Sequence, residues 1–243
     1  NTGNALRTLD GVTCENGDLA ADLEVARGVP RRPDFPEPLG GPEEIETPNV
    51  TTIEALAQML GVDPAATSKA MPVTKDDGTV VLALVRGDDR LEPNKLDSAL
   101  GVPSRPATDE EIRAAFGASG GSLGPVGFLG EIVADEALRE GQFVAGANRD
   151  GRHLRGVEAG RDYAPRFADL RESKDGDTCP HCGGRLRFET AQPFIDAVLA
   201  MVPTVPTLEA LYAFWEANLE SLSLLRAQAT TNAMRIIWRA LLE

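Results

Sequence analysis

Two cysteines near the end of the chain have the residue type and the spacing of metal ligands. They lie in Cys179-Pro180-His181-Cys182-Gly183-Gly184, a C-x-x-C pair followed by two glycines. This pattern is typical of half of a zinc site, because the glycines let backbone N–H groups face the thiolates. A disulfide between such cysteines is disfavoured in a cytoplasmic protein.

Three other features of the sequence do not indicate a function when each is considered alone. The run Ser119-Gly120-Gly121-Ser122-Leu123-Gly124-Pro125 fits a simple glycine turn when taken alone. Lys69 fits an exposed lysine at a helix end. His153, one of two histidines in the chain, fits a surface position on a basic hairpin.

The charge balance of the chain is acidic. The net charge is −14 and the isoelectric point is about 4.6, which counts against tight, nonspecific RNA binding. A local basic patch can still contact an acceptor end, since the local field depends on nearby charges. Contact with RNA and a solvated face with interspersed acids are equally good interpretations of the richest patch, which comprises Arg149, Arg152, Arg155, Arg161, Arg166 and Arg171.

The hydrophobic pattern predicts an α/β fold with a mixed sheet. Residues 20–26 could form one or two helical turns, and the proline-rich run 29–48 reads as a linker. Helices are expected from Thr51 or Thr52 to Gly61, at Pro64, over 94–100, and from a capping box at Thr108 to Gly117; strands are expected over 79–85, 131–134 and 142–146.

The blocks from Pro48 to Asp169 occur in the order and spacing of a known family. They include Pro48-Asn49-Val50-Thr51-Thr52, Leu84-Val85-Arg86-Gly87-Asp88, Gly121-Ser122-Leu123-Gly124-Pro125 and Gly146-Ala147-Asn148. This stretch resembles the editing insertion of bacterial prolyl-tRNA synthetases, in the YbaK-like aminoacyl-tRNA deacylase family. No stretch resembles the catalytic core of a class II synthetase.

The resemblance implies a YbaK-like mixed sheet surrounded by helices, with a crevice for the aminoacylated 3′ end of tRNA. The implied reaction is ester hydrolysis that clears alanine from proline tRNA. Such editing is needed because a missing methylene changes binding by only about 1–3 kcal/mol, so a pocket sized for proline cannot strongly exclude alanine.

The resemblance also assigns roles to site residues. Backbone N–H groups of the loop that includes Gly121, Gly124 and Pro125 would hold the ester carbonyl and the oxyanion. Lys69 would hold the terminal phosphate or orient the ribose, although Pro72 is expected to disturb the start of the strand there. His153 would order water or limit the pocket, and Asp135 would orient Lys69 or water. The attacking group would be water, because no serine or cysteine nucleophile with a matched base is apparent.

The resemblance gives the C-x-x-C pair a partner as well. Many family members carry a second Cys-x-x-Cys before the insertion, and here only its first cysteine, Cys14, is kept, with Gly17 at the second position. Three thiolates remain, from Cys14, Cys179 and Cys182. A structural zinc and loss of the metal are equally compatible with this set, and the editing reaction itself requires no cofactor.

These observations divide the chain into an N-terminal segment and linker (1–48), an editing domain (49–190) and a C-terminal helical tail (191–243). The tail could bind a protein partner or associate with itself through residues 207–243. A cytoplasmic deacylase acting on the tRNA acceptor end, in trans or as part of a prolyl-tRNA synthetase, is the leading interpretation. The alternative is a noncatalytic module that binds tRNA or protein. No apolar run approaches the roughly 20 residues that span a bilayer.

Overall fold

The computed structural model describes residues 10–15, 20–22 and 25–190, and the predicted helical tail over 191–243 lies outside them. The chain forms two compact units, one of residues 1–28 with 174–243 and one of residues 29–173. These limits differ from the sequence boundaries at 48 and 190. Residues 29–48 join the larger unit, and residues 174–190 join the smaller one.

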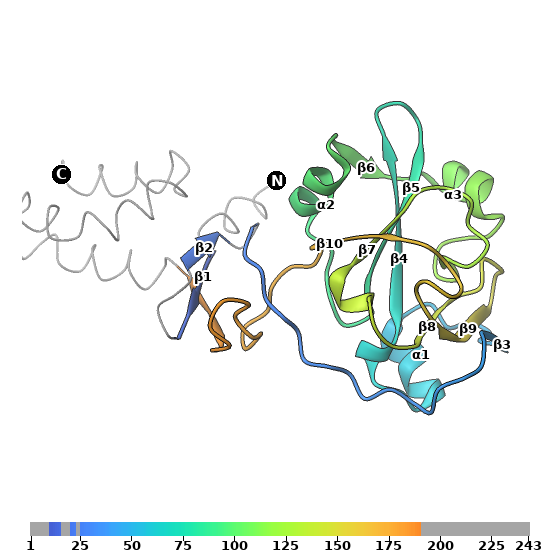
Figure 1. Cartoon of the computed structure of the whole chain (residues 1–243). Coiled ribbons are helices and arrows are strands. Elements are labelled where there is room, and N and C mark those ends of the chain that lie inside the picture. The colour runs from blue at the N-terminus through green and yellow to red at the C-terminus, as the bar shows by residue number, and fades with distance from the viewer. Residues whose placement is uncertain (1–9, 16–19, 23–24, 191–243) are drawn as a thin grey trace, which may run out of the picture. The chain divides into compact units, whose positions relative to one another are not determined.

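A five-stranded mixed sheet is the centre of the larger unit (Figure 1). Its order is β10-β7-β5-β4-β6, with β5 parallel to β7 and β7 parallel to β10, whereas β4 is antiparallel to both neighbours. The α/β prediction with a mixed sheet is therefore confirmed. The strands are β4 (Ser68–Lys75), β5 (Val80–Arg86), β6 (Ser104–Pro106), β7 (Ile132–Asp135) and β10 (Arg166–Ala168).

The central strand β5 is covered on both faces. Leu82 and Leu84 pack in one cluster with Phe116 at the end of α3 (Asp109–Phe116). The intervening side chains Val81, Ala83 and Val85 pack in a second cluster with Leu96 of α2 (Pro93–Leu100). Successive side chains of a strand point to opposite faces, so an unbroken apolar run is what a strand between two helical layers requires.

The helix ends follow local sequence signals. Thr52 caps α1 (Ile53–Leu60), which ends at Gly61 with a left-handed φ of 66°. Thr108 and Glu111 form the predicted capping box of α3. Short 3-10 helices, η2 (Pro64–Ala66) and η3 (Glu136–Leu138), are capped at their N-termini by Asp63 and Asp135. Within the described part of the chain, no helix is long and apolar enough to span a membrane.

A second sheet of three strands lies beside one end of the β4–β5 hairpin (Figure 1). It has the order β3-β9-β8, from Glu43–Glu46, Arg152–Val157 and Phe143–Gly146. The proline-rich run is therefore not a plain linker, because it holds the edge strand β3. Phe35 in the same run packs edge-on against Phe143, with ring centroids 5.0 Å apart.

Pro72 does not disturb β4, contrary to the sequence expectation. Its carbonyl accepts a hydrogen bond from Ala107, on the β6 side of the strand. In a strand the N–H and C=O of one residue face the same side, so the ring nitrogen of Pro72 also faces that side. No bond of the β4–β5 ladder is lost, which is why proline is tolerated inside this strand.

The smaller unit contains a third sheet of order β11-β1-β2. Its strands are β1 (Asp10–Cys14), β2 (Ala20–Asp22) and β11 (Leu186–Thr190). The helical expectation for residues 20–26 is wrong at its start, because 20–22 form a strand. Pairing with β1 supplies the backbone hydrogen bonds there, and such tertiary pairing overrides the weak local preference for helix.

Candidate active site

A pocket of about 330 Å³ in the larger unit brings together three of the predicted site residues. Lys69 enters it from β4, His153 from β9 and Gly121 from the glycine loop. The rest of the lining comes from the start of α1 and neighbouring strands: Val50, Thr51, Thr52, Ile53, Glu54, Leu56, Ser68, Ala70, Met71, Leu123 and Gly146. Segments more than 80 residues apart in the chain therefore meet at one concave surface, as ligand sites commonly do.

The glycine loop is held against the end of β8 by direct backbone packing. A Cβ on Gly124 would lie 1.9 Å from the carbonyl oxygen of Gly146, so no larger residue fits there. The Asn148 side chain locks the loop: its Oδ1 accepts from Gly124 N at 2.8 Å, and its Nδ2 donates to the carbonyls of Gly124 and Val126 at 3.0 Å. Asn148 adopts a left-handed φ of 54°, which asparagine tolerates better than most residues.

The loop residues therefore divide into two groups. Gly124 has its N–H bonded to Asn148, and Pro125 has no N–H to give, so both shape the loop. Gly121 and Leu123 line the pocket, and within the described residues their N–H groups donate no hydrogen bond. Gly121 has a φ of 99°, a conformation that favours glycine.

His153 is buried, with 5% of its surface exposed. Its Nδ1 lies 2.6 Å from the hydroxyl oxygen of Thr47, which is itself fully buried. Burial lowers the pKa of His153 below 6.5, although a backbone hydrogen bond with Gly121 acts in the opposite direction. The imidazole is therefore neutral near pH 7 and is oriented by the Thr47 hydroxyl.

We expect His153 to take up its proton below pH 6.5, because its folded pKa is depressed. NMR titration of the imidazole signals measures this directly, since the chain has only two histidines. A His153→Asn variant identifies which signal belongs to the pocket. A midpoint above 6.5 for that signal would contradict the burial argument.

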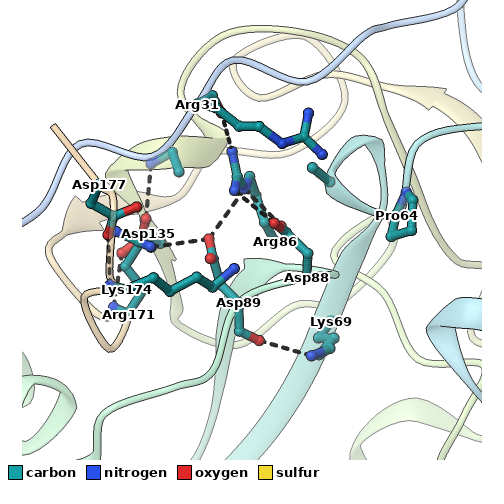
Figure 2. A network of polar contacts seen from close by, with 12 residues as sticks. Arg31, Pro64, Lys69, Arg86, Asp88, Asp89, Asp135, Arg171, Lys174 and Asp177 are labelled. Carbon is teal, nitrogen blue, oxygen red and sulfur yellow. Dashed lines mark hydrogen bonds and ion pairs between the residues drawn. The ribbon is translucent and has the colours of Figure 1, made fainter. Parts of the chain in front are cut away.

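Lys69 is tied to a buried ionic network (Figure 2). Its ammonium donates to the backbone carbonyl of Asp89 at 2.8 Å. The Asp89 carboxylate in turn lies between two guanidinium groups, 3.1 Å from Nε of Arg86 and 3.1 Å from Nε of Arg171. All three charged side chains of this cluster are at most 2% exposed.

Two further contacts hold that network in place. Arg86 also pairs with Asp88 at 3.0 Å and donates to the carbonyl of Arg31 at 2.6 Å. Arg86 and Arg171 come from distant segments of the chain, and both contact the Asp89 side chain. The backbone carbonyl of Asp89, which accepts from Lys69, therefore has a fixed position. We call Arg86, Asp89 and Arg171 the buried triad.

Asp135 does not line the pocket. Its Oδ1 accepts from Ala137 N at 2.9 Å and caps η3, and its Oδ2 accepts from Leu170 N and Arg171 N at 2.7 and 3.1 Å. Burial raises its pKa, although these backbone hydrogen bonds act to lower it. The geometry places Asp135 in the support of residues 170–171, and an orienting role for Lys69 or for water stays a prediction.

The arginines of the basic patch are paired with acids. On the β3–β9 edge, Arg149 and Arg152 both contact Glu44 at 2.9 Å, and Arg155 contacts Glu43. Arg161 contacts Asp162 at 2.8 Å, Arg166 contacts Glu131 at 3.1 Å, and Arg171 belongs to the buried triad. Much of the positive charge of this patch is therefore compensated locally.

Residues 47–163 match the family of the aminoacyl-tRNA editing domain. This segment contains the loop, Lys69, His153 and the whole pocket lining. It is an aminoacyl-tRNA editing domain.

Curated relatives of the editing domain are proline–tRNA ligases. The chain is 38% identical to that of Chromobacterium violaceum over 182 residues, which is 73% of this chain and 32% of the ligase. It is 42% identical over 180 residues to that of Anaeromyxobacter sp. (strain K), covering 71% of this chain and 31% of the ligase. The chain thus spans about a third of the length of these relatives.

The editing domain also resembles solved structures. One, described as a trans-editing enzyme for prolyl tRNA synthetase, is 26% identical, with a TM-score of 0.49. The match covers 54% of this chain and 87% of that one.

Sequence reasoning missed the residues that hold the site together. Asn148 lies in the Gly146-Ala147-Asn148 block but was assigned no role from the sequence, because its side-chain bonds to Gly124 and Val126 are visible only in the folded loop. The sequence around Asp89 does not indicate a buried ion pair, because an acidic residue that follows a strand is usually exposed to solvent. Thr47, which orients His153, could have been suspected because it directly precedes the block that begins at Pro48.

Proposed function

We propose that the editing domain hydrolyses the ester bond of alanine mischarged onto proline tRNA. The observation that carries this proposal is the convergence of Lys69, Gly121 and His153 on one pocket within an editing domain. Curated relatives of this domain include proline–tRNA ligases, which supports proline tRNA as the acceptor.

Water is the attacking group in the proposed reaction. Of the three hydroxyl side chains that line the pocket, Thr51, Thr52 and Ser68, two already have structural bonds. Thr52 Oγ1 caps α1, and Ser68 Oγ donates to the Val144 carbonyl at 3.3 Å. The cysteines of the described chain do not line the pocket. A water placed by the neutral His153 and by the 2′-hydroxyl of the substrate fits these residues better than a covalent intermediate.

The backbone of the glycine loop stabilises the negative charge that develops on the carbonyl oxygen. The N–H groups of Gly121 and Leu123 are the donors we assign, because both residues line the pocket. Fixed donors in a partly enclosed site favour the transition state without reorganising during the reaction. Asn148 contributes indirectly by holding the loop in shape.

The proposal is tested by hydrolysis of three purified substrates: alanyl-tRNA for proline, prolyl-tRNA for proline, and alanyl-tRNA for alanine. We expect rapid release of alanine from the first substrate only. Hydrolysis of prolyl-tRNA at the same rate would overturn the size argument. Absence of hydrolysis with retained binding of the tRNA would support a noncatalytic module instead.

Lys69→Ala should weaken hydrolysis of aminoacyl-tRNA more than hydrolysis of a minimal aminoacyl ester, because only the tRNA offers a phosphate to the ammonium group. High salt should reproduce part of this loss by screening. Lys75→Ala is the matched control, since Lys75 lies on the same strand but pairs with Glu131 at 3.3 Å outside the pocket. Equal losses on both substrates would assign Lys69 to the ester or to folding.

A further inference from the structure

We propose that Cys14, Cys179 and Cys182 bind one zinc ion through three thiolates in the smaller unit. Their sulfur atoms all lie within 4.8 Å of one another, although Cys14 is separated from the pair by more than 160 residues. This site is separate from the proposed editing reaction, because no cysteine of the described residues lines the editing pocket.

The sulfur geometry suits a shared metal. Bonds of about 2.3 Å to a tetrahedral zinc place its sulfur ligands about 3.8 Å apart. The Sγ atoms of Cys14 and Cys182 are 3.2 Å apart, so a movement of a few tenths of an ångström admits the ion. A disulfide would need these two atoms at about 2.05 Å.

The backbone around the pair is folded into a turn that presents both sulfurs. Cys179 N donates to the Gly184 carbonyl at 2.7 Å, and Gly183 N donates to the Cys179 carbonyl at 3.0 Å. Gly183 has a φ of 75°, which favours glycine at that position. Gly184 N points at the Cys182 sulfur from 3.4 Å, an N–H that stabilises a thiolate.

The cross-link would also connect elements that pack together. The described hydrophobic cluster of this unit comprises Val12, Cys14, Ala26, Cys179 and Leu186, and two of these five residues are cysteines. A metal held by Cys14, Cys179 and Cys182 would cross-link the elements that form this described cluster, and the free energy of metal binding then adds to that of folding. A zinc ion would join β1 to the turn before β11, the two strands that already pair along their length.

His181 is exposed and does not belong to the ligand cluster found among the described residues. We therefore assign the fourth position of the zinc to a water molecule or another small ligand from solvent. Three protein ligands and one exchangeable position make this an open zinc site, unlike the closed four-ligand set of most structural zinc sites.

The proposal is tested by metal analysis of the full chain after purification in reducing buffer without chelator. We expect one zinc per chain, and a cobalt-substituted protein whose sulfur-to-metal charge-transfer absorption corresponds to three thiolates. Cys14→Ser, Cys179→Ser and Cys182→Ser should each lower zinc retention at least tenfold. His181→Ala is the matched control within the same turn and should retain one zinc.

Several results would overturn the proposal. A chain that takes up no zinc or cobalt excludes the site. Retention of zinc by Cys14→Ser excludes Cys14 as a ligand, and loss of zinc in His181→Ala excludes a set of three thiolates. Fewer than three reactive thiols after chelation and unfolding would indicate a disulfide in its place.

Chelation gives a second readout, independent of metal content. Removal of zinc should speed hydrogen exchange in β1 and β11 at least tenfold and leave exchange in β5 of the editing domain unchanged. Unchanged exchange in β1 and β11 would contradict a stabilising metal. This outcome does not depend on whether the editing domain is active.

Discussion

Gly121→Ala should lower the rate of alanyl ester hydrolysis by roughly a hundredfold or more, the usual cost of losing one oxyanion donor. Gly121 has a φ of 99°, where an alanine is strained by about 1–3 kcal/mol. The added methyl group itself would meet no atom within 4 Å. The strain would therefore turn the peptide N–H away from the pocket without a clash that unfolds the domain.

Gly120→Ala is the matched control for this change. A Cβ at Gly120 also meets no atom within 4 Å, and the φ of Gly120 is not positive. Single-turnover hydrolysis of alanyl-tRNA measures both variants, and circular dichroism confirms that each is folded. A folded Gly121→Ala variant at the wild-type rate would contradict the assignment of the loop.

The elements that the sequence predicted are those with local determinants. The capping box of α3, the left-handed glycine after α1 and the apolar run of β5 each depend on residues within a few positions of one another. A short peptide segment already carries these signals, and the global fold agrees with them. The glycine loop is assigned to the site because its blocks resemble those of a known family, and its catalytic role stays a prediction.

The features that the sequence did not predict depend on partners far along the chain. The strand β3 forms because Glu43–Glu46 pairs with Arg152–Arg155. No pattern in the proline-rich run predicts this pairing. The family resemblance assigns Asp135 to the site, a role that stays a prediction, but no local pattern shows that its carboxylate accepts from the backbone N–H of Leu170, 35 residues later. The burial of Asp89 between two arginines needs two segments to fold together first.

Asp89→Asn should destabilise the editing domain by about 3–5 kcal/mol, the usual cost of removing one partner from a buried ion pair. The change keeps the shape of the side chain and the backbone carbonyl that receives Lys69. It removes the negative charge between Arg86 and Arg171, whose side chains are 2% exposed. A loss of this size is a large share of the 5–15 kcal/mol that stabilises a typical domain.

The measurement must report on the editing domain alone. Both tryptophans of the chain, Trp215 and Trp238, lie outside the described residues, so hydrogen exchange of β5 and β7 is the suitable probe. Glu44→Gln is the control, because Glu44 is exposed and forms its ion pairs at the surface, where a pair contributes about 0–1 kcal/mol.

A second substitution distinguishes the loss of the Asp89 charge from a change in the shape of its side chain. If the cost of Asp89→Asn comes from the charge left on Arg171, then Arg171→Met should cost less in the Asp89→Asn background than in the wild-type chain. Strictly additive losses, or a loss for Asp89→Asn no larger than for Glu44→Gln, would contradict the idea that the buried triad is held by its charges. Because Lys69 donates to the Asp89 backbone, a folded Asp89→Asn variant that still hydrolyses its substrate would separate this stabilising role from the position of the lysine.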